Sequence, residues 1–407
     1  MIKKIEFLKN EDWLSLLTAI AVILLALVVG GLPGLKFKPD SFSLESLWLI
    51  GGFGLLILIV SLPLLWVQQS TVSRHLLLIA IIFIIGIGSF YISSLDALKK
   101  IGFEYVIISL ITGIIIRSIF GWTDFFKQNS YSEYFVKIGL VILGASIIFG
   151  DILKAGALGM IQALIVVISV WYFAFWVGTK LKIDEEIKIM IASAVSICGV
   201  SAAIATAGAI NGDSKKLSYV ISLVLIVALP MLIFQPMLAV ALQLSPQVAG
   251  AWLGGTIDTT GAVVASGELL GEEALKYSTI VKFSQNILLG AAAVVISIYW
   301  ALKKNNDEKR QSDFAVVWER FPKFILGFLV VSLVYSFVLQ PDQVASTKDF
   351  LKSFQTVLFS IAFVCIGLET DFKALLKTGD GKPALTFIIA QSFNIILTLI
   401  ISWLLFK

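Results

Sequence analysis

Ser193-Ala-Val-Ser-Ile-Cys-Gly-Val-Ser201 and Gly254-Gly-Thr-Ile-Asp-Thr-Thr-Gly261 place small and polar residues inside long apolar runs. Each stretch falls where a membrane-spanning helix is expected, between segments rich in Leu, Ile, Val and Phe. Backbone that leaves the helix at bilayer depth is tolerated only where it is buried in protein or lines a cavity. The two stretches therefore predict interrupted helices, which point to the binding sites of transporters.

The composition defines the broad class of the protein. Of its 407 residues, 58% are hydrophobic and 14% are charged, whereas a soluble domain has about 25% charged residues. We therefore expect an all-α polytopic membrane protein in a lipid bilayer. Its expected partner is a small-molecule or inorganic-ion substrate and not nucleic acid. The oligomeric state is left open between a monomer and a homodimer.

Hydropathy predicts about 11–13 transmembrane helices, because a spanning helix needs about 20 apolar residues. We interpret the run from Leu14 to Val29 as the first of them and not as a cleaved signal peptide. The thirteen candidate segments are 13–31, 46–67, 75–94, 104–121, 134–150, 155–179, 186–210, 217–243, 247–267, 273–301, 321–340, 350–370 and 383–406.

The segments suggest four parts of the chain. Residues 1–103 form N-terminal transmembrane helices, and residues 104–301 contain both polar interruptions. Residues 302–320 form a charged cytoplasmic linker, and residues 321–407 form the C-terminal helices. The distribution of Lys and Arg between loops places the N-terminus in the cytoplasm. The expected location is the bacterial inner membrane.

An internal similarity predicts an inverted repeat. The stretch Phe135–Gly144 resembles Val357–Gly367, and each is an apolar helix followed by an acidic and basic loop. The two belong to the fifth and twelfth segments, so with thirteen spans they would cross in opposite directions. Inverted repeats are typical of secondary transporters.

The interruption at 254–261 carries the more specific chemistry. Asp258 is the one carboxylate that we place deep in a span, where a charge costs about 2.5–3.5 kcal/mol. Thr256, Thr259 and Thr260 add oxygens that suit Na⁺, and Asp258 is also suited to bind a proton. The alternative is a purely structural pairing of Asp258 with Lys282.

Two further groups complete the candidate site. In segment 273–301, Lys282 is the expected charge partner of Asp258, with Gln285 and Asn286 lining the path. In segment 186–210 the candidates for backbone and hydroxyl contacts with a solute are Ser196, Cys198, Gly199 and Ser201. Close helix packing through small residues is the alternative for that segment.

Several motifs resemble the YeiH-like family, which is named for sulfate export and belongs to the bile acid/arsenite/riboflavin transporter superfamily. These motifs are Val136–Lys154, Ile197–Ala203, Ala251–Asp258, Gly271–Ala274, Thr279–Lys282, Gly327–Leu329 and Gly367–Asp371. The resemblance covers about residues 104–407. It implies a panel domain beside a core domain with two crossed, discontinuous helices. A five-plus-five repeat would make the twelfth segment the second crossing helix, whereas the internal similarity pairs the fifth with the twelfth.

The chain departs from the family pattern at two places. Thr256-Ile257-Asp258 stands where the family reads Ser-Ile-His, and Lys282-Phe-Ser-Gln285 stands where it usually reads Lys-x-x-Arg. Both changes remove basic character. A sulfate dianion favours basic pockets, so the departures favour a cation, a proton-coupled neutral solute or a zwitterion.

The sequence thus predicts a secondary active transporter that works by alternating access and is coupled to Na⁺ or H⁺. A passive channel and a membrane sensor or scaffold are the alternatives. We expect no enzymatic activity and no cofactor beyond a bound Na⁺ or proton, because the chain has one histidine and no hydrolase or phosphate-loop motif.

Overall fold

A computed structural model describes residues 10–29, 44–65, 71–93, 95, 105–120, 131–304, 321–369 and 381–407. The described part is all-α, and seven of its helices are long and apolar enough to cross a membrane. The protein is therefore an all-α polytopic membrane protein. The charged linker predicted at 302–320 lies almost entirely outside the described residues.

The chain divides into two compact units, each built from two separate stretches of sequence. Unit 1 comprises residues 1–150 and 323–371, and unit 2 comprises 151–322 and 372–407. This division differs from the four consecutive parts expected from sequence, because the last helix of the chain returns to the unit that contains both interruptions.

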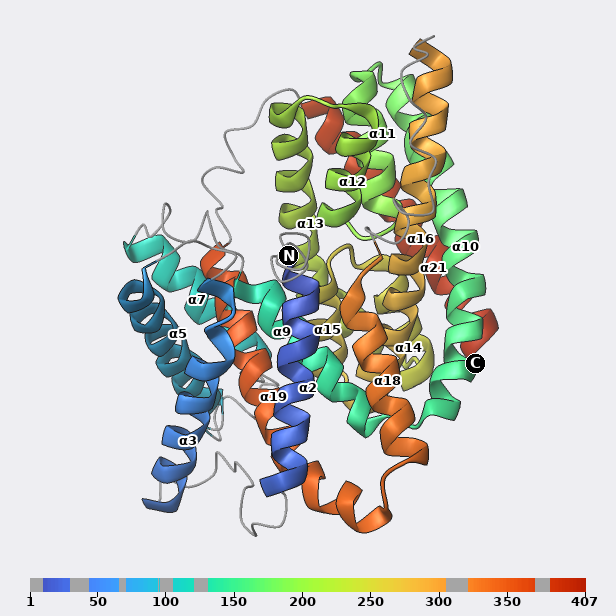
Figure 1. Cartoon of the computed structure of the whole chain (residues 1–407). Helices are drawn as coiled ribbons and strands as arrows, with labels where there is room; N and C mark the ends of the chain where they lie inside the picture. Colours follow the sequence, from blue (N-terminus) through green and yellow to red (C-terminus); the bar gives the residue numbers. More distant parts are fainter. Residues whose placement is uncertain are drawn as a thin grey trace, which may run out of the picture. The chain divides into compact units, whose positions relative to one another are not determined.

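Unit 1 surrounds one long helix, α19 (Figure 1). The described elements of unit 1 include α2 (Glu11–Val29), α3 (Leu44–Ser61), α5 (Val72–Ser93), α7 (Tyr105–Phe120), α9 (Tyr131–Leu143), the 3₁₀ turn η2 (Gly144–Ser146), α18 (Lys323–Phe337) and α19 (Pro341–Glu369). Gly113 and Gly367 let the backbones of α7 and α19 touch, since a Cβ on either glycine would meet main-chain atoms of the other helix at 2.3 Å. Small residues allow such close packing in membranes.

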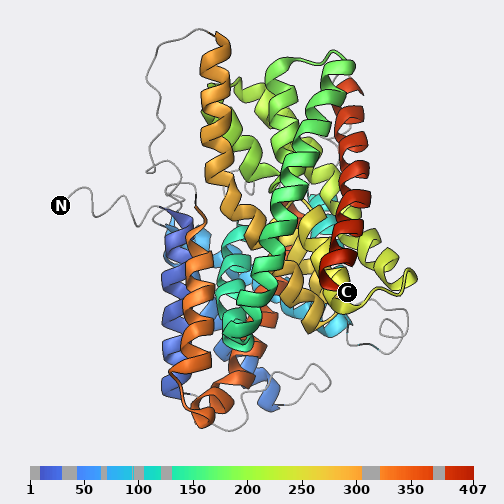
Figure 2. The same cartoon turned by 90° about the vertical axis from the view of Figure 1, so that its right-hand side faces the viewer.

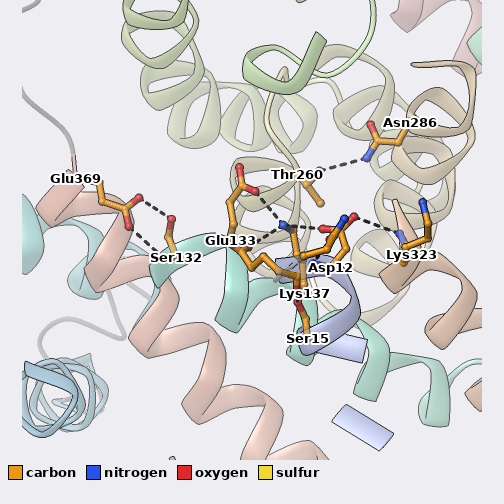
Figure 3. A network of polar contacts seen from close by, with 11 residues as sticks. Asp12, Ser15, Ser132, Glu133, Lys137, Thr260, Asn286, Lys323 and Glu369 are labelled. Carbon is orange, nitrogen blue, oxygen red and sulfur yellow. Dashed lines mark hydrogen bonds and ion pairs between the residues drawn. The ribbon is translucent and has the colours of Figure 1, made fainter. Parts of the chain in front are cut away.

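Unit 1 also holds a partly buried charge cluster (Figure 3). The Lys137 ammonium binds Glu11 at 2.8 Å, Asp12 at 2.9 Å and Glu133 at 3.1 Å. In the same unit, the Glu369 carboxylate accepts hydrogen bonds from the amide and hydroxyl of Ser132. These contacts tie α2, α9 and α19 together.

The α9 and α19 segments, which the sequence paired as an inverted repeat, pack against each other in unit 1. The inverted relation itself stays a prediction. However, α19 is continuous from Pro341 to Glu369, so the twelfth segment is not the second discontinuous helix. That helix is the ninth segment.

The described part of unit 2 contains four long helices and four short ones. They are α10 (Phe149–Lys180, of which 149–150 belong to unit 1), α11 (Glu185–Ser196), α12 (Val200–Ile210), α13 (Ser214–Ala241), α14 (Pro246–Thr256), α15 (Thr260–Leu269), α16 (Glu272–Lys304) and α21 (Gly381–Phe406). The short helices are the halves of the two interrupted segments, so both interruptions predicted from sequence are confirmed.

The first interrupted segment folds back on itself instead of crossing the membrane. At the end of α12 the Asp213 amide donates to the Glu186 carboxylate near the start of α11, at 3.2 Å. Lys216 also binds Asp184 at 2.9 Å and Glu186 at 3.3 Å. A straight segment would separate these residues by about 40 Å. Helices α11 and α12 therefore form a re-entrant pair, hairpin 1.

The second interrupted segment also folds back. Near the start of α14, the Gln247 amide donates to Glu273 at 2.6 Å, just beyond the end of α15. Gly254 in α14 and Gly267 in α15 both pack on Ser278 of α16. The two arms are therefore side by side and form hairpin 2.

The hairpins enter unit 2 from opposite ends. Helix α13 joins the base of hairpin 1 to the base of hairpin 2, and its 28 residues span about 42 Å. Figures 1 and 2 show α11 and α12 at one end of the unit and α14 and α15 toward the other. The seventh and ninth segments were expected to span. Each of them instead forms two short arms. Hydropathy predicted a single span because it does not distinguish two short arms from one helix of the same total length.

Candidate functional site

The tip of hairpin 1 is a sharp break at a glycine. Helix α11 ends at Ser196, and α12 begins at Val200 after Gly199, which has a φ of +58°. A side chain at this φ is strained. A Cβ here would also lie 3.0 Å from the Cβ of Asp258 and 2.7 Å from Val224. Only glycine fits this position without strain.

The tip of hairpin 2 is extended and polar. Helix α14 ends at Thr256, and Ile257 adopts an extended conformation. The Thr259 hydroxyl then accepts a hydrogen bond from the Ala262 amide at 3.3 Å and caps α15. Asp258 therefore lies in non-helical backbone between two helix ends.

The two tips meet, and Lys282 bridges them. From α16 its ammonium donates to the carbonyl oxygens of Ile197 in hairpin 1 and Ile257 in hairpin 2, both at 2.8 Å. It also donates to the Gln285 side chain at 3.1 Å. These contacts satisfy carbonyls at the C-terminal ends of α11 and α14, where the helix dipole favours a positive charge.

Helix α21 holds the same tips from another direction. Asn394 donates to the Val195 carbonyl in hairpin 1 at 3.1 Å, and Gln391 donates to the Thr256 carbonyl in hairpin 2 at 2.8 Å. Four carbonyls at the two breaks, those of Val195, Ile197, Thr256 and Ile257, thus accept hydrogen bonds from side chains, as bilayer depth requires.

Two buried acceptors at the tips lack partners. Asp258 Oδ2 and Asn286 Oδ1 have no hydrogen-bond partner in the described part of the chain, although both residues are at most 4% exposed. The Asn286 amide nitrogen donates to the Thr260 hydroxyl at 3.3 Å (Figure 3). A buried acceptor without a donor costs about 1–3 kcal/mol, so this site is suited to a ligand that supplies a donor or a positive charge.

Lys282 and Asp258 do not form the direct ion pair expected from the sequence. The Lys282 ammonium binds the carbonyl of Ile257, the residue before Asp258, but within the described part of the chain it makes no direct ion pair with the Asp258 carboxylate. The ammonium is occupied by tip carbonyls instead. The Asp258 Cβ lies beside Gly199, which precedes the first turn of α12, where the dipole favours a carboxylate.

The remaining candidates lie around this centre. Cys198 is buried within the first break. The Ser196 hydroxyl donates a hydrogen bond to the Ser193 carbonyl at 3.4 Å. Gln285 donates to the Gly255 carbonyl at 2.9 Å. Ser201 is exposed in the first turn of α12, so it is the candidate that lies outside the buried tip contacts.

Sequence reasoning missed the partners that other helices supply. Gln235 on α13 donates to the Thr256 hydroxyl at 2.7 Å. Gln162 on α10 donates to the Ala251 carbonyl at 2.8 Å and accepts from Ser402. Their signal in the sequence is an isolated amide in an apolar helix.

At the base of hairpin 1, outside the spanning helices, Asp184 caps α11. Burial raises the pKa of Asp184, but hydrogen bonds from Lys216 and two backbone amides outweigh burial and hold the pKa below its ordinary value. Across the described residues, no three His, Cys, Asp or Glu side chains gather as a transition-metal site would require.

The fold and the site together define a polytopic membrane protein whose second unit brings two re-entrant hairpin tips together. Residues 76–386 match the model of a family described as Conserved hypothetical protein 698. The chain therefore belongs to that family.

Its relatives carry a name that specifies the membrane but no solute. A UPF0324 membrane protein of Rhodopirellula baltica is 37% identical over 80% of this chain and 62% of its own length. One of Nitratidesulfovibrio vulgaris is 36% identical over 80% of this chain and 59% of its own. The chain thus spans about three fifths of the length of these relatives. No solved structure matches it.

Proposed function

We propose that the protein is a secondary transporter that moves a small solute or ion by alternating access, driven by a Na⁺ or H⁺ gradient. The observation that supports this function best is the meeting of two re-entrant hairpin tips around Asp258 and Lys282. Interrupted helices that expose polar groups at mid-membrane are characteristic of secondary transporters.

The length of the hairpin arms supports a site at mid-depth. The arms contain 10 to 12 residues, which corresponds to about 15–18 Å. This is roughly half of the 30 Å hydrocarbon core. Arms of this length from opposite ends therefore meet near the middle of the membrane.

The tip has both a buried and an accessible side. Asp258, Lys282 and Asn286 are buried, whereas Thr259 and Thr260 are half-buried and Ser201 is exposed. A solute that reaches Thr260 is near the unpartnered oxygens. In this proposal Asp258 binds the proton or a cationic group, and the first turns of α12 and α15 contact the rest of the solute.

The class of solute follows from the polar groups. The unpartnered acceptors favour a solute that carries a hydrogen-bond donor or a positive charge. The resemblance to the YeiH-like family supports transport, but the less basic site disfavours the sulfate dianion. A zwitterion, a cation or a proton-coupled neutral solute fits better.

The distribution of lysines gives the proposed orientation. The end of unit 2 at the base of hairpin 1 carries Lys180, Lys182, Lys188, Lys215, Lys216 and Lys382, whereas the opposite end carries Lys154, Lys276 and Lys407. Cytoplasmic ends carry more Lys and Arg, so we place the base of hairpin 1 in the cytoplasm. Because hairpin 1 is re-entrant, Lys215 and Lys216 join this side.

Flux into liposomes tests the function. The full chain is reconstituted with a Na⁺ or H⁺ gradient and offered sulfate, sulfonates and amino acids. Gradient-dependent, saturable uptake of at least one solute is expected, with at least a tenfold loss in Asp258→Asn. Asp151→Asn is the control, since Asp151 forms a partly exposed ion pair with Lys276.

Equal uptake by wild type and Asp258→Asn would remove Asp258 from the site. Flux that does not saturate and never exceeds equilibrium would support a passive channel. Lack of flux for every solute would favour the sensor or scaffold.

A further inference from the structure

Two glutamines converge on the last residue of α14. Gln235 from α13 donates to the Thr256 hydroxyl at 2.7 Å, and Gln391 from α21 donates to the Thr256 carbonyl at 2.8 Å. Gln391 also contacts the Met231 sulfur at 3.1 Å. Both glutamines are at most 4% exposed.

The orientation of both amides is fixed by Thr256. Its hydroxyl donates to the Trp252 carbonyl, so toward Gln235 the hydroxyl acts as acceptor, and the Gln235 nitrogen must face it. A carbonyl only accepts, so Gln391 must also present its nitrogen to Thr256. Exchanging nitrogen and oxygen in either amide would bring two acceptors together.

The two amide oxygens are consequently unpartnered. Gln235 Oε1 and Gln391 Oε1 are buried and have no hydrogen-bond partner among the described residues. An unpartnered buried acceptor costs about 1–3 kcal/mol. The two oxygens belong to amides that are both held by Thr256 through their nitrogens, and they favour a ligand that offers positive charge or hydrogen-bond donors.

The electrostatics around Thr256 favour a cation over a neutral donor. Thr256 is the last residue of α14, where the helix dipole carries partial negative charge. Amide and hydroxyl oxygens are hard ligands of the kind that bind Na⁺.

We propose that Gln235 Oε1 and Gln391 Oε1 form a Na⁺ site at the C-terminal end of α14, distinct from Asp258. Occupation would tie α13, hairpin 2 and α21 together through Thr256. The role of this ion in coupling rests on the proposed transport function, but its binding does not. The site is also separate from the proton or solute position at Asp258.

Thermal unfolding of the purified full-length protein tests the site. NaCl replaces choline chloride at constant ionic strength. The unfolding temperature is expected to rise with Na⁺ and to saturate, because a ligand stabilises the state that binds it. KCl is expected to produce a much smaller shift.

The variants Gln391→Leu and Gln235→Leu each remove one ligand oxygen from a different helix. Each is expected to raise the apparent Na⁺ dissociation constant at least tenfold. Gln162→Leu is the matched control. Gln162 is equally buried and holds the same hairpin, but both of its polar groups have partners. This control is expected to lower the unfolding temperature and to keep the Na⁺ dependence.

Lack of a Na⁺ effect on the wild-type protein would overturn the site and assign the two oxygens to an internal water. An equal effect of K⁺, or full Na⁺ dependence in either leucine variant, would overturn it too. If a leucine variant fails to fold, the other variant and the wild-type titration decide. If the Na⁺ site fails in these measurements, Asp258-dependent transport in the absence of Na⁺ would still support the proposed function.

Discussion

The two hairpins have the same architecture but contribute different properties to the tip they share. Hairpin 1 breaks at Gly199, whose missing side chain gives space to Asp258. Hairpin 2 breaks at Ile257–Thr259 and supplies the carboxylate and the hydroxyls. Hairpin 1 thus provides the space beside Asp258, and hairpin 2 provides the polar side chains. The shape of hairpin 1 is what allows a charged residue to lie at the centre of unit 2.

At the bases of the hairpins, hairpin 1 has the stronger charge interactions. The base of hairpin 1 is held by charges, with Lys216 between Asp184 and Glu186. The base of hairpin 2 has a bond between the Gln247 amide and the Glu273 carboxylate. Because the two bases lie at opposite ends of unit 2, we expect the hairpins to enter the membrane from opposite faces. We expect the more basic face, at the base of hairpin 1, to be cytoplasmic.

Cysteine labelling tests this topology and has an all-or-none outcome. Lys182→Cys and Ser214→Cys mark the two ends of hairpin 1, and both positions are exposed. We expect a membrane-impermeant maleimide to label both from the same face of the membrane. The background is a chain in which Cys198 and Cys365 are replaced by alanine.

Gln243→Cys and Glu272→Cys mark the exposed ends of hairpin 2 and should label together from the other face. Labelling of positions 182 and 214 from opposite faces would show that the segment spans the membrane, and the re-entrant architecture would be wrong.

Removing the bridge between the tips should have the largest effect on stability. Lys282→Met leaves the Ile197 and Ile257 carbonyls without their donor and Asp258 without a nearby cation. Breaking a buried charged contact costs about 3–5 kcal/mol. Thermal unfolding in detergent measures the loss.

Lys276→Met is the control for this substitution. Lys276 forms a partly exposed ion pair with Asp151, which is worth about 0–1 kcal/mol. The double variant Lys282→Met/Asp258→Asn should lose less stability than the sum of its single variants, because the two sites interact. If the stability losses of the two single variants add strictly in the double variant, Lys282 and Asp258 do not interact energetically.

A methyl group at the break of hairpin 1 should have a somewhat smaller effect. Gly199→Ala adds left-handed backbone strain of about 1–2 kcal/mol and crowding against Val224 and Asp258 of about 1–3 kcal/mol. Gly271→Ala separates the two costs, because Gly271 has a φ of +98° but open space around its Cβ position. Equal losses of unfolding temperature in both variants would contradict close contact between the tips.

The sequence predicted the class and both breaks because small and polar residues at mid-segment are rare in spanning helices. Gly199 and the Ile257–Thr259 stretch are found where the pattern indicated them. Both arms together have the length of one span, so hydropathy alone predicted crossing segments. The fold-back depends on contacts such as Glu186 with Asp213, which the sequence does not reveal.

The site was predicted in part for a similar reason. Asp258 and Lys282 were recognisable as charges inside apolar segments. Gln235 and Gln391 are neutral, and their importance comes from meeting at Thr256, although 135 residues separate Gln391 from Thr256. Distant pairings of this kind depend on the packing of α13, α14 and α21.

The Lys282 bridge has a consequence for biosynthesis. In the order of translation, Lys282 follows Ile197 by 85 residues and Ile257 by 25 residues. Asn394 follows Val195 by 199 residues. Until those later helices emerge, the tip carbonyls lack their final partners. During insertion, the two hairpin tips therefore acquire their final hydrogen-bond partners only after α16 and α21 have been translated.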